Sequence, residues 1–334
     1  MTRMSEAVPE LFAQALRELG LAGDEPLRGV PLTGGVSSDI WRIDTAAGPV
    51  CAKRALPKLR VAADWRAPIE RNLYEARWMR VADAAVPGCT PRVLGQHPRL
   101  GVLVMGWLPA HVPWKQQLRD GLADERTAAA VGGTLARIHA HAAARPALAA
   151  EFDSQAIFFD IRLEPYLLAT ARKHADLAPQ LQALVCSTQA QARTLVHGDV
   201  SPKNILVDGH APVLLDAECA VWSDPAFDLA FCLNHLLLKC LWTPAAAAGF
   251  LRCFDALAQA YRDGIAWEPA DALEQRAAQL LPGLLLARAD GKSPVEYLDE
   301  RGRDRVRRVA RPLLQRGPAR LDEVVQAWRQ EIGT

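Results

Sequence analysis

The chain has 334 residues, enough for one large or two medium domains with a substantial buried core. Basic and acidic residues nearly balance, 39 against 38, and the net charge of +1 leaves no electrostatic footprint for nucleic acid or an anionic membrane. No window of about 18 uncharged apolar residues occurs, and the first residues lack the apolar core of a signal peptide. We therefore expect a small-molecule partner and no transmembrane helix.

The seven cysteines are scattered, and most lie within apolar stretches. Because no CxxC pair occurs, the sequence indicates neither a zinc site nor a disulfide framework. A reducing cytoplasm is the simplest setting for such a chain. We expect Cys219 to be a buried small apolar residue rather than a reactive thiol.

The first hundred residues predict a small sheet with a leading helix and one long helix. A small-residue turn around Gly34, Gly35 and Ser37 separates two apolar segments, so its backbone N–H groups can approach a ligand and cradle phosphate oxygens. The expected elements are a helix at 9–20, a hairpin at 30–43, a strand at 48–55, a helix at 68–85, and strands at 93–95 and 100–105.

The rest of the sequence predicts helices almost throughout, apart from one polar stretch near residue 200. We place the boundary at 106/107, giving a sheet-containing N-terminal domain, 1–106, and a helical C-terminal domain, 107–334, in an α+β fold. The expected helices are 124–144, 158–173, 177–193, 225–240, 245–263, 269–289 and 303–331, the last broken near Gly317 and Pro318.

The polar stretch is a loop between short apolar strands, Leu195-Val196 before it and Ile205-Leu206-Val207 after it. A turn at Asp208-Gly209 and a returning strand at 212–215 complete a hairpin. The open end of that hairpin should bring Asn204 and Asp216 side by side, with Asp199 just upstream. Two carboxylates and an amide oxygen are a donor set suited to Mg²⁺.

This pattern, His197-Gly198-Asp199, then Asn204, then Asp216-Ala217-Glu218, resembles the catalytic and metal-binding segments of the protein-kinase-like fold. The form is that of aminoglycoside phosphotransferases, choline kinases and methylthioribose kinases. The resemblance implies a two-lobed fold that uses ATP and Mg²⁺, with Asp199 as the base and Asn204 and Asp216 as metal ligands. Glu218 would reach a second metal through water or cap the following loop. His197 and Asp228 would support the catalytic loop.

The same resemblance assigns a nucleotide-binding role to residues of the N-terminal domain. Lys53, in a strand similar to the kinase Val-Ala-x-Lys strand, would bind the α/β phosphates. Its partner would be Glu75, or Glu70 if the helix register differs by a turn. Gly34, Gly35 and Ser37 would cover the phosphates, and Met105 and Trp107 would contact adenine. Gly106 stands where many members carry an acidic residue.

Two features argue against a protein substrate. Only eleven residues separate Asp216 from Asp228, too few for a protein-kinase activation segment, and Gly198 replaces the Arg that receives an activation-loop phosphate. The segments 55–61 and 162–166 look closest to methylthioribose kinases. The catalytic loop, Val-Ser-Pro-Lys-Asn, departs from that branch and is more similar to aminoglycoside-phosphotransferase relatives of unassigned substrate.

The candidate acceptor contacts are Asp160, Arg162, Arg288 and Asp290, with Lys292 nearby. Alternatively, the basic residues near 288–292 simply complement the negative end of a helix that Gly291 terminates. A polycationic aminoglycoside calls for a denser acidic pocket, so we expect a sugar-like or other hydroxyl metabolite, including one resembling methylthioribose. An aminoglycoside antibiotic phosphotransferase and a non-catalytic nucleotide-binding scaffold are the alternatives. The sequence leaves open the acceptor, a choice between ATP and GTP, and a monomer or homodimer.

Overall fold

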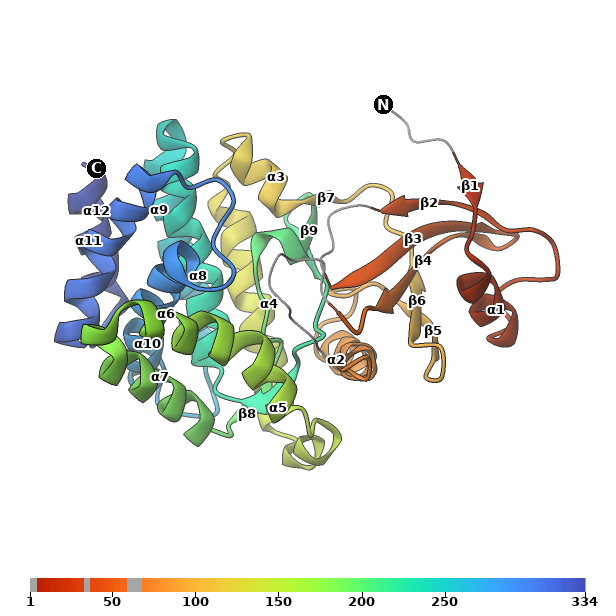
Figure 1. Ribbon diagram of the computed structural model, residues 1–334, viewed down its shortest axis with the longest axis horizontal. Helices are drawn as coiled ribbons and strands as arrows, with labels where there is room; N and C mark the ends of the chain where they lie inside the picture. Colours follow the sequence, from red (N-terminus) through yellow and green to blue (C-terminus); the bar gives the residue numbers. More distant parts are fainter. Residues whose placement is uncertain (1–4, 33–36, 59–67, 334) are drawn as a thin grey trace. The chain divides into compact units, whose positions relative to one another are not determined.

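A computed structural model of the chain describes residues 5–32, 37–58 and 68–333 (Figure 1). The chain divides into two compact units, Met1–Ala110 and His111–Thr334. Our sequence-based boundary lay at 106/107. Each unit is described below by itself. All seven cysteines are free thiols.

The first unit contains a six-stranded antiparallel sheet in the order β1-β2-β3-β4-β6-β5. The sequence predicted five of these strands and missed β1, which is too short to show an alternating pattern. The bounds are β1 (Glu6–Ala7), α1 (Glu10–Glu18), β2 (Arg28–Leu32), β3 (Ser38–Thr45), β4 (Gly48–Ala55), α2 (Arg71–Ala85), β5 (Val93–His97) and β6 (Val102–Gly106).

The core of the first unit lies between α1 and one face of this sheet. Phe12 and Leu16 of the amphipathic α1 pack with Ile43, Ala52 and Val104 of the sheet. This packing makes the leading helix part of the first unit's core.

The second unit is mainly helical, with two small antiparallel sheets of order β10-β9-β7 and β11-β8. Its strands are β7 (Val112–Pro113), β8 (Thr194–Val196), β9 (Ile205–Asp208), β10 (Ala211–Leu214) and β11 (Val221–Ser223). Its helices are α3 (Trp114–Arg119), α4 (Glu125–Ala143), η1 (Pro146–Glu151), α5 (Gln155–Phe158), η2 (Phe159–Leu168), α6 (Ala169–Lys173), η3 (Ala175–Leu177), α7 (Ala178–Ala190), η4 (Pro202–Asn204), α8 (Ala226–Trp242), η5 (Pro244–Ala246), α9 (Ala247–Asp263), α10 (Ala270–Asp290), α11 (Glu300–Arg316) and α12 (Leu321–Ile332).

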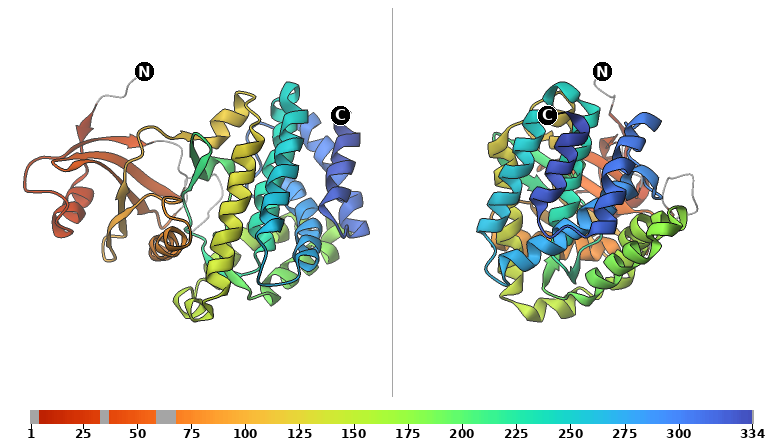
Figure 2. Two further views of the ribbon diagram at one scale, coloured as in Figure 1. Left: turned by 180° about the vertical axis from the view of Figure 1, so that it is seen from behind. Right: turned by 90° about the vertical axis from the view of Figure 1, so that its left-hand side faces the viewer.

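Helix α8 is the centre of this unit and is buried on all sides from Ala226 to Cys240. It packs on α9 and α10, while α9 also packs on α4 and α10 on α11, so the long helices form a continuous bundle (Figure 2). A helix that is apolar all round is expected to be a core helix. Within the described ranges no helix has both the length and the apolarity to cross a membrane.

The helix predicted at 158–173 contains an irregularity that the sequence did not reveal. Its middle part, η2, is a π-helix with Pro165 inside it, between the α-helical α5 and α6. Proline cannot donate the hydrogen bond of a regular α-helix, and π turns occur frequently at functional sites. Arg162 and Tyr166, both discussed below, lie on this π-helical segment.

The helix predicted at 303–331 is two helices, α11 and α12. The break falls at Gly317, as predicted, and this residue closes α11 in a left-handed conformation with φ of 69°.

Two adjacent glycines of α4 provide a test of the α4–α9 packing. A Cβ added to Gly132 would lie 2.2 Å from the Leu257 carbonyl oxygen of α9, whereas a Cβ on Gly133 would meet nothing within 4 Å. Gly132→Ala should destabilise the protein by at least about 2 kcal/mol. Gly133→Ala should raise stability by about 0.5–1 kcal/mol through helix propensity. Urea unfolding of both variants measures this, and equal stabilities would contradict the packing.

Candidate active site

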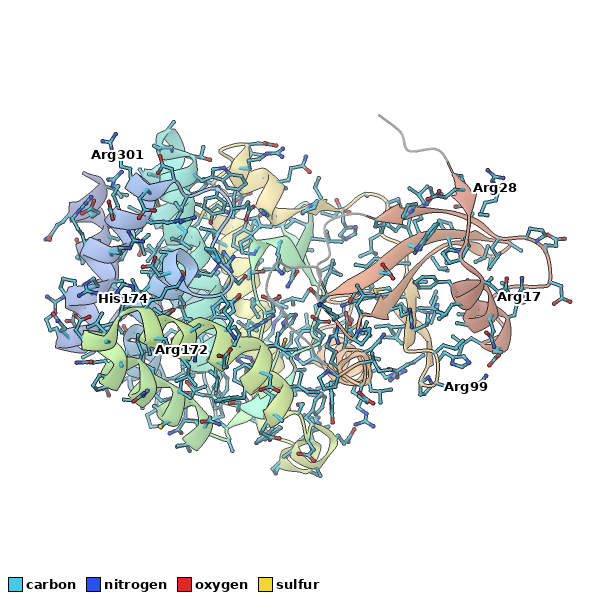
Figure 3. All side chains as sticks on the ribbon, in the orientation of Figure 1. Arg17, Arg28, Arg99, Arg172, His174 and Arg301 are labelled. Carbon is cyan, nitrogen blue, oxygen red and sulfur yellow. The ribbon has the colours of Figure 1, made fainter. Side chains whose placement is uncertain are left out.

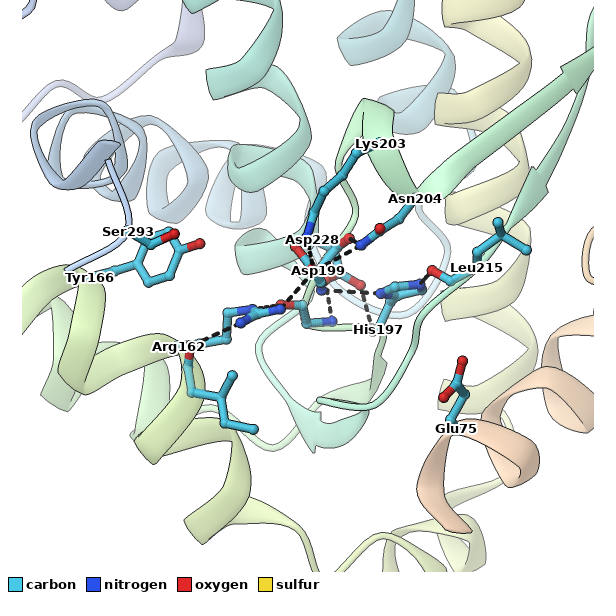
Figure 4. A network of polar contacts seen from close by, with 12 residues as sticks. Glu75, Arg162, Tyr166, His197, Asp199, Lys203, Asn204, Leu215, Asp228 and Ser293 are labelled. Carbon is cyan, nitrogen blue, oxygen red and sulfur yellow. Dashed lines mark hydrogen bonds and ion pairs between the residues drawn. The ribbon is translucent and has the colours of Figure 1, made fainter. Parts of the chain in front are cut away.

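The polar loop 197–204 connects two short buried strands of the second unit. β8 leads into the loop and pairs with β11, while β9 leads out of it and pairs with β10. The side chains of this loop form a dense network of polar contacts (Figure 4).

Asp228, at the start of α8, holds the backbone of this loop. One carboxylate oxygen accepts from the His197 N–H at 2.7 Å and the other accepts from the Gly198 N–H at 2.8 Å. His139 of α4 lies 3.2 Å from the same carboxylate and 2.7 Å from the Tyr261 hydroxyl. The side chain of Asp228 is fully buried. The contacts expected of Asp228 as a loop support are therefore present.

His197 connects the loop to the neighbouring hairpin. Its Nδ1 accepts from the Asp199 N–H at 3.1 Å, so the ring proton sits on Nε2, which donates to the Leu215 carbonyl at 3.0 Å. Burial lowers the pKa of His197, which favours this neutral form. These two contacts connect the loop to the segment that follows β10, and the supporting role of His197 stays a prediction.

Gly198 cannot be replaced by a larger residue without moving the loop. Its φ is +78°, and an added Cβ would lie 2.8 Å from the Cys219 carbonyl oxygen. Burial raises the pKa of the Cys219 thiol, in keeping with its expected role as a small buried residue.

Three donors converge on one oxygen of the Asp199 carboxylate. Asn204 Nδ2 and Arg162 Nη2 each lie 2.8 Å from Oδ2, and Lys203 Nζ lies 3.3 Å from it. The other oxygen, Oδ1, makes no hydrogen bond to any residue in the described part of the chain. Asp199 is 3 % exposed, so the carboxylate is fixed by its neighbours and has one oxygen left for a further partner.

Arg162 is a component of this network rather than a surface contact. Its Nε donates to the Gly198 carbonyl at 2.5 Å and its Nη1 to the Ile161 carbonyl at 2.9 Å. Burial opposes the charge of Arg162, but Asp199 and more weakly Glu218 outweigh it, and the pKa of the guanidinium is raised. The sequence placed Arg162 near the acceptor without revealing its ion pair, because the two partners are far apart in the chain.

Lys203 was not assigned a role from the sequence. The nearby Asp199 carboxylate raises the pKa of the lysine, whose side chain is half exposed. It follows Asp199 by four residues, in the 3-10 turn η4, and this spacing is the one signal that could have indicated the contact.

The predicted metal ligands lie at the open end of the β9–β10 hairpin. Its register pairs Ile205 with Leu214, and the Leu215 N–H donates to the Asn204 carbonyl at 2.8 Å, so Asp216 follows one residue later. Asp216 has φ of 68°, a left-handed conformation rare for residues other than glycine, asparagine and aspartate.

This donor set fits Mg²⁺. Because Asn204 Nδ2 is bonded to Asp199, its side-chain oxygen is the atom left to bind a cation, and Asp216 follows directly after Leu215, which is hydrogen-bonded to the Asn204 backbone. Glu218 is buried and lies close enough to Arg162 to raise the pKa of that residue. Among the described residues no three His, Cys, Asp or Glu side chains form a metal-binding group. Mg²⁺ is usually bound by only a few protein oxygens, and waters and phosphate oxygens complete its coordination shell.

In the first unit, Lys53 of β4 and Glu75 of α2 form the expected ion pair. Lys53 Nζ lies 2.7 Å from Glu75 Oε2, and both side chains are buried. Glu70, the alternative partner, is exposed and precedes the helix. The structure thus resolves a helix register that the sequence left open.

The other predicted nucleotide contacts are only partly described. The Ser37 carbonyl accepts from Arg71 at 2.6 Å and from the Leu56 N–H at 2.9 Å, which fixes the start of β3. Met105 is buried in β6 opposite Cys51. Arg42 lies 5.8 Å from the Trp107 ring. Gly34 and Gly35 lie outside the described residues.

Of the candidate acceptor residues, Arg162 and Arg288 lie 5.9 and 5.7 Å from the Tyr166 ring, whereas the two carboxylates have other surroundings. Asp160 is exposed. The Asp290 carboxylate binds Arg307 at 2.6 Å and His174 at 2.9 Å, and His174 lies among the helices at the C-terminal end of the chain (Figure 3). Lys292 pairs with Glu164 at 2.7 Å. Arg288 differs from these residues, because it donates to the Tyr166 hydroxyl at 3.2 Å and has no ion pair within the described ranges.

Comparison with known proteins identifies the class. Residues 28–273 match the model of the phosphotransferase enzyme family. Since this match covers well over half of the chain, the chain belongs to the phosphotransferase enzyme family.

Curated relatives narrow the comparison to small-molecule kinases. The chain is 26 % identical over 234 residues to a methylthioribose kinase of Pectobacterium carotovorum, covering 61 % of this chain and 58 % of that protein. It is 26 % identical over 231 residues to the methylthioribose kinase of Enterobacter sp. strain 638, covering 60 % and 57 %. The chain therefore spans less than two thirds of the length of these relatives.

Solved structures share the fold at low identity. A choline/ethanolamine kinase family protein from Mesorhizobium loti has a TM-score of 0.52 at 18 % identity, with 96 % of this chain and 99 % of that chain covered. Amicoumacin kinase hAmiN, in complex with AMP-PNP, Ca²⁺ and Ami, has a TM-score of 0.58 at 13 % identity, with 94 % and 96 % covered. The fold is thus the protein-kinase-like fold of small-molecule kinases, as the motifs implied.

The support of the loop by Asp228 is testable by an isosteric change. In Asp228→Asn an amide nitrogen would face a backbone N–H in the fully buried site, so we expect a loss of about 3 kcal/mol in unfolding free energy. The control is Asp208→Asn, at an exposed carboxylate of the β9–β10 hairpin. This change should alter stability by less than about 0.5 kcal/mol. Urea unfolding compares the two variants. Equal midpoints would mean that the carboxylate does not hold the loop.

Proposed function

We propose that this chain transfers the γ-phosphoryl group of ATP to a hydroxyl group of a small molecule. The observation that carries the proposal is the Asp199 carboxylate, which has Oδ2 held by Arg162, Lys203 and Asn204 and has Oδ1 unbonded within the described residues. A fixed, buried carboxylate with one oxygen available is suited to accept a proton from an alcohol.

Asp199 orients the acceptor hydroxyl and takes its proton as the bond from that oxygen to the γ-phosphorus forms. The bond between the γ-phosphorus and the bridging oxygen breaks, and ADP leaves. The three donors on Oδ2 keep the carboxylate in one orientation, which is the main contribution a protein makes to this reaction. Asp228 and His197 act on the same geometry through the loop backbone.

The remaining predicted residues provide nucleotide binding in this proposal. Lys53, oriented by Glu75, binds the α/β phosphates of ATP. Asn204 and Asp216 would hold Mg²⁺, which when bound would supply positive charge to the phosphate oxygens. Glu218 supports these ligands from its buried position beside Arg162.

The acceptor we propose is a sugar-like or other hydroxyl metabolite. The curated relatives are methylthioribose kinases, which supports this class. An aminoglycoside antibiotic is the weaker candidate, because cationic side chains, Arg162 and Lys203, lie directly beside Asp199 and would repel a polycation. A non-catalytic scaffold is disfavoured because the lysine, the base and the metal-binding aspartate are all present.

Replacing the base tests the mechanism. Asp199→Asn retains an oxygen that can accept the three donors but cannot take a proton, so kcat should fall by about 10²–10⁴-fold. The KM for ATP should change little. Steady-state ADP release with a panel of sugars, thiosugars, choline-type alcohols and kanamycin-type compounds measures this. Near-normal turnover in the variant would show that Asp199 is not the base. Wild-type ATP binding without turnover on any acceptor would favour the scaffold.

Replacing the metal ligand should separate nucleotide binding from folding. Asparagine tolerates the left-handed backbone of residue 216, so Asp216→Asn should fold normally and bind Mg-ATP at least about tenfold more weakly. Thermal-shift titrations with ATP, with Mg²⁺ or EDTA, compare it with Asp208→Asn, whose exposed carboxylate lies at the turn of the hairpin. An unchanged Mg-dependent shift in Asp216→Asn would remove Asp216 from the metal site.

A further inference from the structure

A group of cationic and aromatic residues surrounds one face of α8. We call it the Lys239 cluster, and it consists of His235, Lys239 and Trp242 of α8, Arg288 of α10, Lys115 of α3 and Tyr297. Phe231, His235 and Lys239 follow one another at intervals of four residues, so they lie along one side of the helix. The cluster was not indicated by the sequence, in which Lys239 reads as the last polar residue of an apolar helix.

Lys239 is buried without a counter-ion. It is 1 % exposed and makes no hydrogen bond or ion pair with any residue of the described ranges. Its Nζ lies 4.1 Å from the Trp242 ring centre and 4.0 Å from that of Tyr297, and the two rings are stacked 4.4 Å apart. Cation–π contacts compensate only part of the cost of burying an ammonium group.

The surrounding charges do not supply the missing anion. Burial lowers the pKa of Lys239 to about 7, and Lys115 and Arg288 lower it while Glu296 raises it. The Glu296 carboxylate is bound to Lys115 at 2.5 Å and is largely exposed. One carboxylate thus stands against three cations, and the cluster keeps an excess of positive charge.

Arg288 likewise has no ion-pair partner among the described residues. Its guanidinium donates to the Tyr166 hydroxyl and to the carbonyl and hydroxyl of Ser293, and its buried Nε has no hydrogen-bond partner within the described residues. The hydroxyl of Tyr297 is likewise buried and without a partner in that part of the chain. A lysine, an arginine and a tyrosine therefore have unused donors in one cluster.

Tyr166 connects this cluster to Asp199. Arg288 contacts the Tyr166 hydroxyl, and the guanidinium of Arg162 lies 5.9 Å from the Tyr166 ring and 2.8 Å from Asp199. Figure 4 shows Tyr166 and Ser293 on the side from which Arg162 approaches Asp199.

His235 gives a second link between the cluster and Asp199. Its ring centre lies 5.5 Å from that of Phe231, and the guanidinium of Arg162, which pairs with Asp199, lies 5.8 Å from the Phe231 ring. Burial, with a further contribution from surrounding cations, lowers the pKa of His235 well below the usual range. The cluster is therefore linked to the proposed base through Phe231 as well as through Tyr166.

We propose that the phosphate acceptor is an anion, with its hydroxyl at Asp199 and its carboxylate or phosphate group bound by Arg288 and Lys239. The inference rests on the proposed kinase function and defines the substrate class of the same site. An anion would supply the charge that Lys239 lacks and accept from the unused Arg288 donor, since guanidinium groups suit both carboxylates and phosphates. A quaternary ammonium or polyamine acceptor would instead meet an excess of positive charge.

Matched acceptors test the charge requirement. ADP release is measured with glycerol, D-glycerate and glycerol 3-phosphate, and with ribose, ribonate and ribose 5-phosphate. One anionic form should exceed its neutral parent in kcat/KM by at least about 30-fold, and the carboxylate and phosphate arms identify the group. Phosphorylation of neutral or cationic compounds with no preference for anions would overturn the proposal while leaving the kinase function intact.

Variants of the Lys239 cluster test whether these residues cause the preference for anionic acceptors. Lys239→Met and Arg288→Met should each reduce the anionic-to-neutral ratio of kcat/KM by at least about 30-fold. Lys173→Met, at an exposed lysine of α6, should leave the ratio unchanged. If Lys239 serves only to pack against the two stacked aromatic rings, its replacement would change thermal stability without changing the ratio, and the proposal would be wrong.

A binding measurement decides the matter even if no compound in the panel is phosphorylated. Inorganic phosphate and D-glycerate are used as probes, with sodium chloride at equal ionic strength as the reference. At least one probe should raise Tm in the wild type, in Lys173→Met and in Asp199→Asn, but not in Lys239→Met. Equal shifts in the wild type and Lys239→Met, or no shift in either, would overturn the anion site. Loss of turnover in Asp199→Asn with the shift retained separates this site from the proposed chemistry.

Discussion

A single buried carboxylate, that of Asp228, holds the backbone at the start of the loop 197–204. It binds two consecutive backbone N–H groups, those of His197 and Gly198, immediately before Asp199. Backbone donors buried away from water must find acceptors, and here they find a carboxylate that also contacts His139 of α4. The position of Asp199 therefore depends on the packing of α4 and α8. The central helix of the core is in this way also the support of the proposed active site.

The side chains around Asp199 explain how this buried carboxylate is held in one orientation. Arg162 and Lys203 compensate its charge, and Asn204 adds a neutral donor to the same oxygen. In the proposed function Asn204 would have two roles, since its amide nitrogen orients Asp199 while its oxygen is available for a cation. The proposed proton acceptor and the proposed metal site are coupled through this one side chain, which fixes their positions relative to each other.

Much of this could be predicted from the sequence because the decisive residues lie close together in the chain. The spacing from Asp199 through Asn204 to Asp216 defines a loop and hairpin, and local geometry follows from that spacing. The Lys53–Glu75 pair was predicted with Glu70 as an alternative, because periodicity does not fix the rotation of α2 against the sheet. That rotation is set by side-chain packing between distant segments.

Other features could not be predicted because they depend on long-range packing. The pairing of Arg162 with Asp199 joins η2 to the catalytic loop, and no short-range pattern encodes it. Asp290 was a candidate acceptor contact, yet its carboxylate binds Arg307 and His174, which only the arrangement of α11 reveals. The isolation of Lys239 from any described carboxylate is a property of the folded core, since charge balance in the sequence does not show which charges are buried together.

The π-helical segment η2 has a consequence for how this site tolerates length changes. A π turn accommodates one more residue than an α turn, so deleting one residue between Arg162 and Tyr166 would favour regular α-helical winding in this segment. Side chains on opposite sides of the deletion would then rotate by about 100° relative to each other. Arg162 and Tyr166 could not both keep their present directions, and the guanidinium would turn away from the carboxylate that it now neutralises. This helix should therefore tolerate substitutions better than insertions or deletions. A constant helix length is then a characteristic feature of the site.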